Sequence, residues 1–306
     1  MPTAFQPPFT LTPLLQRQLK AIDEARGFLE AVRLQGDWHD TLRGQRRVQD
    51  ALSSVQIEGN SLTYDQAFVL AQGEPDRDLR DSEREFLNYL RAFEAIDGLC
   101  GRKEVRLTRA DLLNLHRILL QGVRGGQRFS GQLRREQVSV GDRVDGEIVV
   151  HHQPPTWGEV EALVDDLFQW IDAVKQHPTR RQLTKGAEDL WLHPVLAAGI
   201  AQHRMVWIHP FVDGNGRSAR MLTTMLLYLR GYDFKGLFDL STYYEQNRDA
   251  YYEALRTADA TGDYTRWLEY FTGGFAMQMF AIKAVAAKHA AGVTAPEPEA
   301  VTAGEA

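Results

Sequence analysis

The twelve residues from His209 to Arg220, HPFVDGNGRSAR, constrain this chain more than any other stretch. They join two apolar segments, and the apolar residues after Gly216 recur at helical spacing up to the residue before Gly231. The glycines therefore lie where the backbone enters a helix, at the end whose free N–H groups and dipole attract an anion. Arg217 and Arg220 share one side of its first turn. Two cations at this end repel the dipole and each other, which predicts that a polyanion such as a phosphate chain binds between them.

Two other residues of this stretch have chemistry that suits a phosphate. Asp213 can hold a Mg²⁺ ion, because magnesium binds one or two carboxylates together with substrate phosphates. His209 can take a proton from an attacking hydroxyl, since its ordinary pKa lies near working pH. A base, a metal ligand, an anion-binding turn and two cations together predict transfer at phosphorus. The P-loop motif Gly-x-x-x-x-Gly-Lys-Ser/Thr does not occur in the sequence, and a structural loop with a buried histidine is the plainer alternative.

The stretch resembles the signature of the Fic family, His-x-Phe-x-Asp/Glu-Gly-Asn-Gly-Arg-x-x-Arg, at every defined position. The resemblance implies an all-α Fic-fold helical bundle with a small β-hairpin flap and an N-terminal helical arm. It also implies transfer of AMP from ATP to a Tyr, Thr or Ser hydroxyl of a target protein, with His209 as the base and Asp213 as the Mg²⁺ ligand. The residues that it implies for ATP binding are Gly214, Asn215, Gly216, Arg217 and Arg220.

A second motif lies before this region, at Ser54 and Glu58. Gly59-Asn60 is typical of a helix end, so Glu58 lies in a last helical turn, where a carboxylate faces the negative end of the dipole and needs a cationic partner. The segment resembles the inhibitory motif of many Fic proteins, Ser/Thr-x-x-x-Glu-Gly/Asn. The resemblance implies that Glu58 pairs with Arg220 and blocks productive seating of the ATP γ-phosphate. A surface glutamate before a helix end is the alternative interpretation.

The region from residue 121 to residue 153 lacks helical spacing. Alternation of apolar and polar residues, followed by the turn signal Asp145-Gly146 and a short apolar run, predicts a β-hairpin. The apolar residues of this hairpin are Val138, Val140, Ile148, Val149 and Val150. By resemblance it is a flap that holds an extended segment of the target protein by main-chain pairing. A hairpin that only covers the helical body is the alternative.

Helical spacing, capping pairs and glycine stops place the remaining elements. The expected helices cover residues 12–34, 40–57, 63–71, 81–96, 156–171, 193–207 and 264–289, with another starting at residue 108. The segment from residue 240 to residue 252 has aromatic residues at helical spacing and is expected to be one helix. By resemblance that helix neighbours the adenine, which makes Tyr244 and Asn247 candidates for the base pocket.

The chain is expected to divide into three parts. Residues 1–100 form an N-terminal helical arm with the inhibitory helix, and residues 101–290 form the catalytic domain. Residues 291–306 form a tail rich in Pro, Glu and Ala, whose composition is typical of disorder.

Composition limits the classes of partner and compartment. The 306 residues carry a formal net charge of −6, which argues against non-specific nucleic-acid binding. A single cysteine, Cys100, excludes an internal disulfide and suits a reducing cytosol. No apolar stretch reaches the length of about 18 residues that a membrane span needs. We therefore expect a soluble cytoplasmic protein without membrane contact, and the histidine spacings match no zinc motif.

The sequence leaves other functions open. Fic-type enzymes differ in donor and direction, and Glu58 also suits removal of AMP with the glutamate orienting a water. Another nucleotide or phosphoryl transfer, or a module that senses ATP without catalysis, are further alternatives. The target protein (another protein or the chain itself), the modified hydroxyl, formation of a homodimer and the signal that releases Glu58 are not determined by these residues.

Overall fold

The structure, a computed structural model, describes residues 5–32, 36–73, 77–102, 105–123, 125–126, 128–144, 147–174 and 192–290, with backbone only for residues 36–37, 142–144 and 147–148. The predicted hairpin turn Asp145-Gly146 and the predicted disordered tail 291–306 lie outside these residues.

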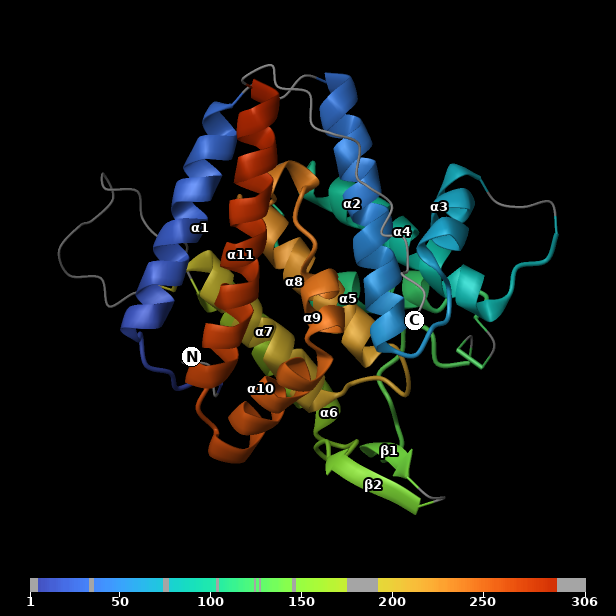
Figure 1. Ribbon diagram of the computed structural model, residues 1–306. Helices are drawn as coiled ribbons and strands as arrows, with labels where there is room; N and C mark the ends of the chain where they lie inside the picture. Colours follow the sequence, from blue (N-terminus) through green and yellow to red (C-terminus); the bar gives the residue numbers. More distant parts are fainter. Residues whose placement is uncertain are drawn as a thin grey trace.

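The described residues form an all-helical body with one small two-stranded sheet (Figure 1). The first helices in chain order are α1 Pro13–Ala31, α2 Gly36–Ile57, α3 Tyr64–Gln72, α4 Asp81–Cys100 and α5 Arg109–Leu119. The sheet follows, with β1 Val140–Val144 and β2 Glu147–His152. The remaining elements are α6 Val160–Ala173, α7 Pro194–Ile208, α8 Asn215–Leu229, the 3₁₀ turn η1 Phe234–Gly236, α9 Leu240–Gln246, α10 Arg248–Thr261 and α11 Thr265–Ala290.

Helix α1 shows how sequence signals place these elements. Thr12 is its N-cap, and the hydroxyl oxygen of Thr12 accepts the backbone N–H of Leu15 at 3.2 Å, while Pro13 provides a fixed φ at the first position. The buried residues Leu15, Leu19, Ile22, Ala25 and Leu29 recur at helical spacing. Helix α1 lies beside α11 (Figure 1), so chain segments from opposite ends of the sequence share one packed layer.

Helices α7 and α8 form the centre of the body and pack against each other. Most residues of both helices are buried, as expected for helices that are surrounded by others. One apolar core runs from Phe5 to Ala286 and includes residues on both sides of the domain boundary predicted near residue 100. The loop between α7 and α8 is therefore anchored at both ends in rigid structure.

Some predicted element limits are wrong. Helix α4 continues through Gly98 to Cys100, and the capping pair Thr156–Glu159 organises a turn ahead of α6, which begins only at Val160. The segment expected as one helix after residue 240 is two helices, because Asn247 leaves the helical region with φ −123° and ψ 42°. Local spacing could not show this break, since aromatic residues lie at helical spacing on both sides of it.

The predicted β-hairpin is confirmed as an antiparallel pair of strands. Val144 pairs with Glu147 at the outer end of the described strands, and Val140 pairs with His152 at the base. The pair extends away from the helices at the lower edge of the molecule (Figure 1). Val149 and Val150 are exposed on β2. A hairpin that projects in this way leaves main-chain groups available for pairing.

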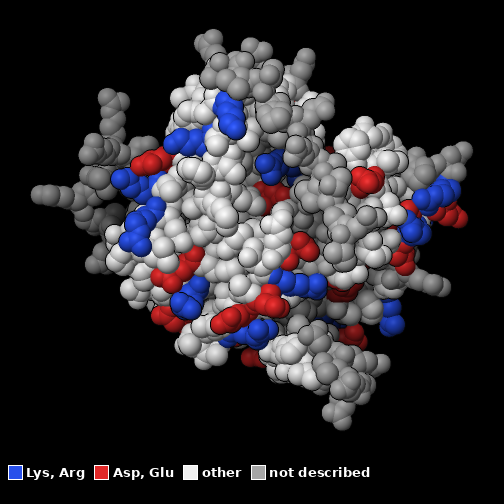
Figure 2. All heavy atoms as spheres, in the orientation of Figure 1, with Lys and Arg blue, Asp and Glu red and all other residues white. Residues whose placement is uncertain are grey.

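Charges are interspersed on the surface. On the face drawn in Figure 2, basic and acidic side chains of the described residues alternate, with no broad area of one sign. No helix within the described ranges combines the length and the apolar character that crossing a bilayer would require.

Two buried carboxyl groups join α2 to the start of α9. Asp50 accepts the backbone N–H of Ser241 at 3.0 Å, and Asp239 caps α9 by accepting the backbone N–H of Thr242 at 3.0 Å. The two carboxyl groups also hydrogen-bond to each other. Burial raises the pKa of Asp239 well above its ordinary value, and the carboxylate of Asp50 adds to this rise. Asp239 is therefore the protonated partner, since two buried carboxylates cannot both be charged at low cost.

We expect the free energy of unfolding of the wild type to fall as pH rises, and we expect this fall to be smaller in Asp239→Asn. Because the pKa of Asp239 is raised in the folded state, the folded protein binds more protons than the unfolded chain above pH 3.8, and its free energy of unfolding falls with rising pH. The side-chain amide of asparagine can still accept the backbone N–H of Thr242, and its NH₂ group can still donate to Asp50. In urea unfolding from pH 5 to pH 8, the free energy of unfolding should fall less in the variant than in the wild type. The exposed Asp249→Asn is the control, and an equal pH dependence of wild type and Asp239→Asn would contradict the shared proton.

Candidate active site

The signature loop, residues 209–216, begins and ends in left-handed backbone conformations. His209 follows α7 with φ 49° and ψ 59°, and Gly214 precedes α8 with φ 78°. Glycine adopts this conformation without strain, whereas a histidine there is uncommon. The chain thus reverses direction within a few residues, and the first N–H groups of α8 follow directly after this loop without helical acceptors.

Side chains within the loop hold its shape. The amide of Asn215 forms two 2.9 Å hydrogen bonds with the backbone of Phe211, donating to its carbonyl and accepting from its N–H. Phe211 is completely buried and its ring stacks on His116, with ring centroids 3.6 Å apart. Asn215 was predicted to bind phosphate. Its side-chain amide is instead used within the loop, which leaves its backbone N–H as the group that could bind an anion.

His116 fastens the loop to α5. Its Nδ1 accepts the backbone N–H of Gly131 at 2.9 Å, so its Nε2 carries the proton and donates to the carbonyl of Asp213, also at 2.9 Å. Burial lowers the pKa of His116 to about 4, which keeps the ring neutral. The sequence did not indicate this hydrogen-bonding role of His116.

His209 is poised to act as a base. Burial lowers its pKa to about 4, so the ring is neutral at pH 7. Its Nδ1 lies 3.4 Å from the carbonyl oxygen of Val206, which favours the tautomer with the proton on Nδ1. The lone pair of Nε2 is then free to accept a proton from a bound hydroxyl.

Both arginines of the loop are buried and held by acidic residues. Arg217 forms ion pairs with Glu85 at 3.1 Å and with Asp213 at 3.2 Å. Arg220 donates from Nε to the hydroxyl of Ser54 at 2.7 Å and from Nη2 to the carboxylate of Glu58 at 2.8 Å. The two cations thus stand at the N-terminus of α8 as predicted, and each has a carboxylate from an N-terminal helix or its end as a partner.

The carboxylate of Glu58 lies over the anion-binding turn. Glu58 follows the last residue of α2, and 35% of its side chain is exposed. A methyl group added to Gly216 would clash with the carboxylate oxygen of Glu58, which shows how closely the carboxylate approaches the start of α8. The carboxylate of Glu58 therefore occupies the position that a bound anion would take at the N-terminus of α8.

Asn60, two residues after Glu58, contacts the carboxylate partner of the other arginine, which the sequence did not indicate. Its Nδ2 donates to Glu85 at 2.9 Å and to the carbonyl of Ser82 at 3.0 Å. Glu85 in turn pairs with Arg217. Partners of this kind come from helices far apart in the sequence, and no local spacing signals them.

Other predicted site residues lie at the edge of this arrangement. Tyr244 is fully buried, its hydroxyl donates to Gln202 at 3.3 Å and its ring stacks on Tyr251. Asn247 is exposed and donates to the carbonyl of Tyr243 at 2.9 Å. The placement in the base pocket stays a prediction, and a ring as buried as Tyr244 could only line such a pocket from behind.

The flap residues show mixed exposure. Val138 and Val140 are half-buried, whereas Val149 and Val150 are exposed. The backbone of Ile148 lies in β2, and its side chain is outside the described part of the structure.

Asp213 is the residue of the loop that suits a metal ion. Its side chain is 60% exposed, and its Oδ1 accepts the N–H of Gly214 at 2.6 Å. The described residues contain no cluster of three or more His, Cys, Asp or Glu side chains arranged as a metal site. This arrangement fits Mg²⁺, which commonly binds one protein carboxylate and completes its octahedral shell with phosphate oxygens and water.

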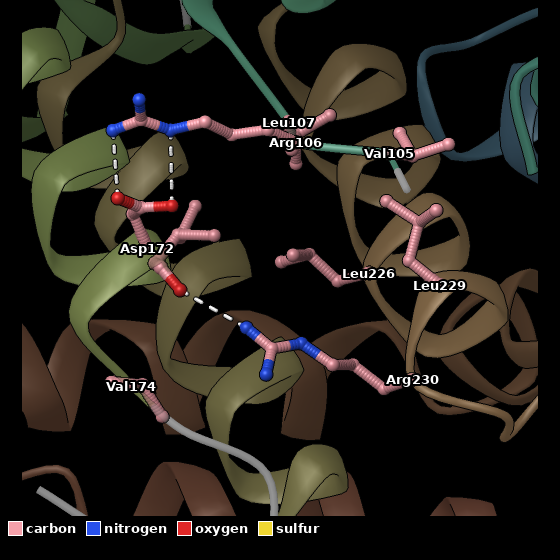
Figure 3. A pocket seen from close by; sticks show the side chains of 9 residues that line it. Val105, Arg106, Leu107, Asp172, Val174, Leu226, Leu229 and Arg230 are labelled. Atoms are coloured by element: carbon pink, nitrogen blue, oxygen red, sulfur yellow. Dashed lines mark hydrogen bonds and ion pairs between the residues drawn. The ribbon is translucent and has the colours of Figure 1, made fainter. Parts of the chain in front are cut away.

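A pocket of about 350 Å³ lies at the opposite end of α8 (Figure 3). Its apolar walls include Leu226 and Leu229, and Arg230 donates to the carbonyl of Ile171 at 3.0 Å. Arg230 thereby satisfies a free carbonyl near the C-terminus of α6, where the helix dipole favours a cation and opposes an anion. This pocket therefore does not offer the kind of anion site that is predicted for the N-terminus of α8.

Comparison with known proteins agrees with this geometry. The model of the Fic/DOC family matches residues 106–227. The curated "Protein adenylyltransferase Fic" of Drosophila mojavensis is 30% identical over 246 residues, which cover 80% of this chain and 43% of that protein. The Drosophila melanogaster protein of the same name is also 30% identical, over 80% of this chain and 44% of that protein. The chain therefore spans less than half the length of these relatives.

Solved structures show the same fold. A Fic family protein from Desulfovibrio desulfuricans has a TM-score of 0.72 and 25% identity, over 93% of this chain and 78% of that chain. A Fic domain containing signaling protein from Bacteroides thetaiotaomicron has a TM-score of 0.66 and 23% identity, over 91% of this chain and the whole of that chain. The chain belongs to the Fic family and carries the Fic/DOC domain at residues 106–227.

Proposed function

We propose that this protein transfers AMP from ATP to a hydroxyl group of a target protein. The observation that carries the proposal is the neutral, half-buried His209 in the loop that leads into a helix N-terminus with two arginines. This combination places a base next to an anion site, which transfer at phosphorus requires. The name of the curated relatives, protein adenylyltransferase, supports the same reaction.

The reaction that fits these residues is an in-line substitution at the α-phosphorus. The hydroxyl oxygen of the target forms a bond to this phosphorus as its proton moves to Nε2 of His209. The bond from the α-phosphorus to the oxygen that bridges to the β-phosphorus breaks, and diphosphate leaves with the electron pair. The products are an AMP–protein phosphodiester and diphosphate, with the proton on His209 returned to solvent.

The remaining residues of the loop bind charge. The backbone N–H groups of Asn215 and Gly216 bind the α- and β-phosphates at the turn that begins with Gly214, and Arg217 and Arg220 neutralise the triphosphate, with Arg220 at the γ-phosphate. Mg²⁺ held by Asp213 would supply further neutralisation of the phosphate oxygens.

The resting enzyme is held inactive by Glu58. Its carboxylate pairs with Arg220 at 2.8 Å and lies over Gly216, so it competes with the γ-phosphate for the same cation and the same space. Ser54 adds a second contact by accepting the Nε proton of Arg220 at 2.7 Å. ATP can still bind by its base and ribose, but the triphosphate cannot take the position that in-line attack needs.

The substrate is a protein segment that pairs with the flap. The exposed Val149 and Val150 lie on β2, whose main-chain groups offer strand addition to an extended peptide. This mode of binding presents a Tyr, Thr or Ser hydroxyl without reading much of the surrounding sequence. It suits a target protein or a second copy of this chain.

The position of the label in ATP tests the proposal. Glu58→Gly protein with Mg²⁺ is incubated with ATP labelled on the α- or the γ-phosphate, and label in protein is followed. We expect incorporation only from the α-phosphate, with diphosphate released in equal amount. Label from the γ-phosphate would identify phosphoryl transfer instead. If neither label enters protein although ATP binds, AMP transfer is rejected in favour of removal of AMP or of ATP sensing.

A further inference from the structure

Arg134 is a buried arginine between the flap and the signature loop. Only 3% of it is exposed, and it lies in an extended segment directly before the hairpin. Within the ranges that the structure describes, every acceptor of its guanidinium is a backbone carbonyl, and none belongs to a carboxylate. A buried cation without an acidic partner is costly, so its position calls for a specific reason.

The guanidinium of Arg134 joins three segments of backbone. Nε donates to the carbonyl of His209 at 2.8 Å, Nη1 donates to Glu136 at 3.0 Å and Nη2 donates to Pro155 at 2.6 Å. The backbone N–H of Arg134 also donates to the carbonyl of Pro210 at 2.8 Å. Glu136 lies before β1 and Pro155 lies after β2, so they form the two roots of the flap. One side chain therefore connects both roots with the histidine of the signature loop.

The end of α7 needs such a partner. Its last carbonyls lack helical N–H donors, and His209 has a left-handed conformation that surrounding contacts must hold. The carbonyl of Ile208 also accepts from Nη2 of Arg134, at the longer distance of 3.5 Å. A cation at a helix C-terminus interacts favourably with the dipole. Burial of Arg134 is thus compensated by four carbonyls rather than by a counter-ion.

We infer that Arg134 is a positioning residue that fixes the imidazole of His209 and both flap roots as one unit. The inference rests on the proposed function, because it concerns where the target hydroxyl meets the base. The flap holds the target segment, and the signature loop holds the base. Proton transfer needs the hydroxyl oxygen and Nε2 of His209 within hydrogen-bond distance, so a rigid connection between the two parts sets the reaction geometry.

Lysine could not replace Arg134 in this role. The planar fork of arginine directs donors to several carbonyls at once, whereas an ammonium group is a single point of donation on a flexible stem. Arg134→Lys therefore keeps the charge and loses the connection, and Arg134→Met loses both. Arg135, the exposed neighbour, provides matched control substitutions to Lys and Met.

The test compares these four variants in the Glu58→Gly protein. We expect Arg134→Lys and Arg134→Met to lower kcat for AMP transfer by about 10-fold or more, while the Kd for ATP changes less than about 2-fold. The Arg135 variants should match their parent in both quantities. ATP binding and thermal melting show whether each variant is folded. If Arg134→Met does not fold, the kcat of Arg134→Lys tests the inference. Unchanged kcat in Arg134→Lys would overturn the inference.

Two readouts do not depend on activity. Amide hydrogen exchange at residues 136–138, 153, 156, 208, 209 and 211 should become about 10-fold faster in both Arg134 variants than in the Arg135 variants. By NMR, the pKa of His209 should rise in Arg134→Met, since the positive charge of Arg134 helps burial to lower it, and should rise less in Arg134→Lys. If the Glu58→Gly parent transfers no AMP, the proposed function fails, and exchange still decides whether Arg134 connects flap and loop. Equal protection of these amides from hydrogen exchange in all variants would exclude a connection of flap and loop by Arg134.

Discussion

Replacing His209 with alanine in the Glu58→Gly protein should abolish AMP incorporation, with a loss of about 10²- to 10⁴-fold in kcat. The neutral ring is the group of the signature loop that can accept the hydroxyl proton, because burial lowers its pKa to about 4. Its side chain makes no described contact with Arg217 or Arg220, so the phosphate site should remain. The measurement is incorporation of α-labelled AMP at saturating ATP, together with the Kd for ATP.

The Kd for ATP distinguishes loss of the catalytic base from loss of the phosphate-binding site. An unchanged Kd with lost incorporation assigns His209 to the chemical step. If His209→Ala keeps full incorporation, the base must be another group and the proposed mechanism is wrong. His116→Ala is a less suitable control, because His116 holds Phe211 and the loop.

The acid side of the pH profile provides an independent check on His209. A histidine with its ordinary pKa of 6.5 would be protonated at pH 5.5 and would cost about 10-fold in kcat/KM there. With the pKa lowered to about 4, the base stays neutral as pH falls from 7 to 5.5. We therefore expect kcat/KM of Glu58→Gly to change less than about 2-fold over this interval. A 10-fold decrease would show that His209 titrates as an exposed ring.

Sequence reasoning reached the signature loop because its signals are local. Residues Gly214 and Gly216 mark a turn into a helix, and the histidine, acid and arginines follow in one short stretch. The helices that flank the loop were predicted for the same reason, since helical spacing and capping pairs are properties of adjacent residues. The family resemblance added the pairing of Glu58 with Arg220, which the structure places at 2.8 Å.

The parts that sequence reasoning missed depend on distant partners. Arg134 and His116 look like an ordinary cation and a core histidine until the fold places carbonyls of the signature loop beside them. Asn215 showed the opposite case: its position in the motif suggested a phosphate ligand, but its side chain completes the loop by bonding to Phe211. Hydrogen bonds of this kind are specified by tertiary packing, and the residue types alone do not reveal them.

Replacing Glu58 with glycine should both destabilise the protein without ATP and strengthen its response to ATP. Without Glu58, the buried Arg220 loses its carboxylate partner, which should lower stability by about 1–3 kcal/mol, less than for a fully buried pair because 35% of the Glu58 side chain is exposed. The γ-phosphate then becomes the partner of Arg220. ATP at about 100 times its Kd should add about 2.7 kcal/mol of stability.

Thermal melting with and without Mg-ATP measures both the loss of stability and the stabilisation by ATP. AMP incorporation should rise by about 10-fold or more in Glu58→Gly, which corresponds to about 1.4 kcal/mol. Glu58→Gln, which loses the charge but keeps a group of similar size over Gly216, should give an intermediate response because it still occupies the space of the γ-phosphate. A lower melting temperature alone would show only that an ion pair was lost. If ATP raises the melting temperature of Glu58→Gly no more than that of the wild type, Glu58 and the γ-phosphate do not compete for Arg220. The opposite signs of the two changes thus distinguish an inhibitory contact from a merely stabilising one.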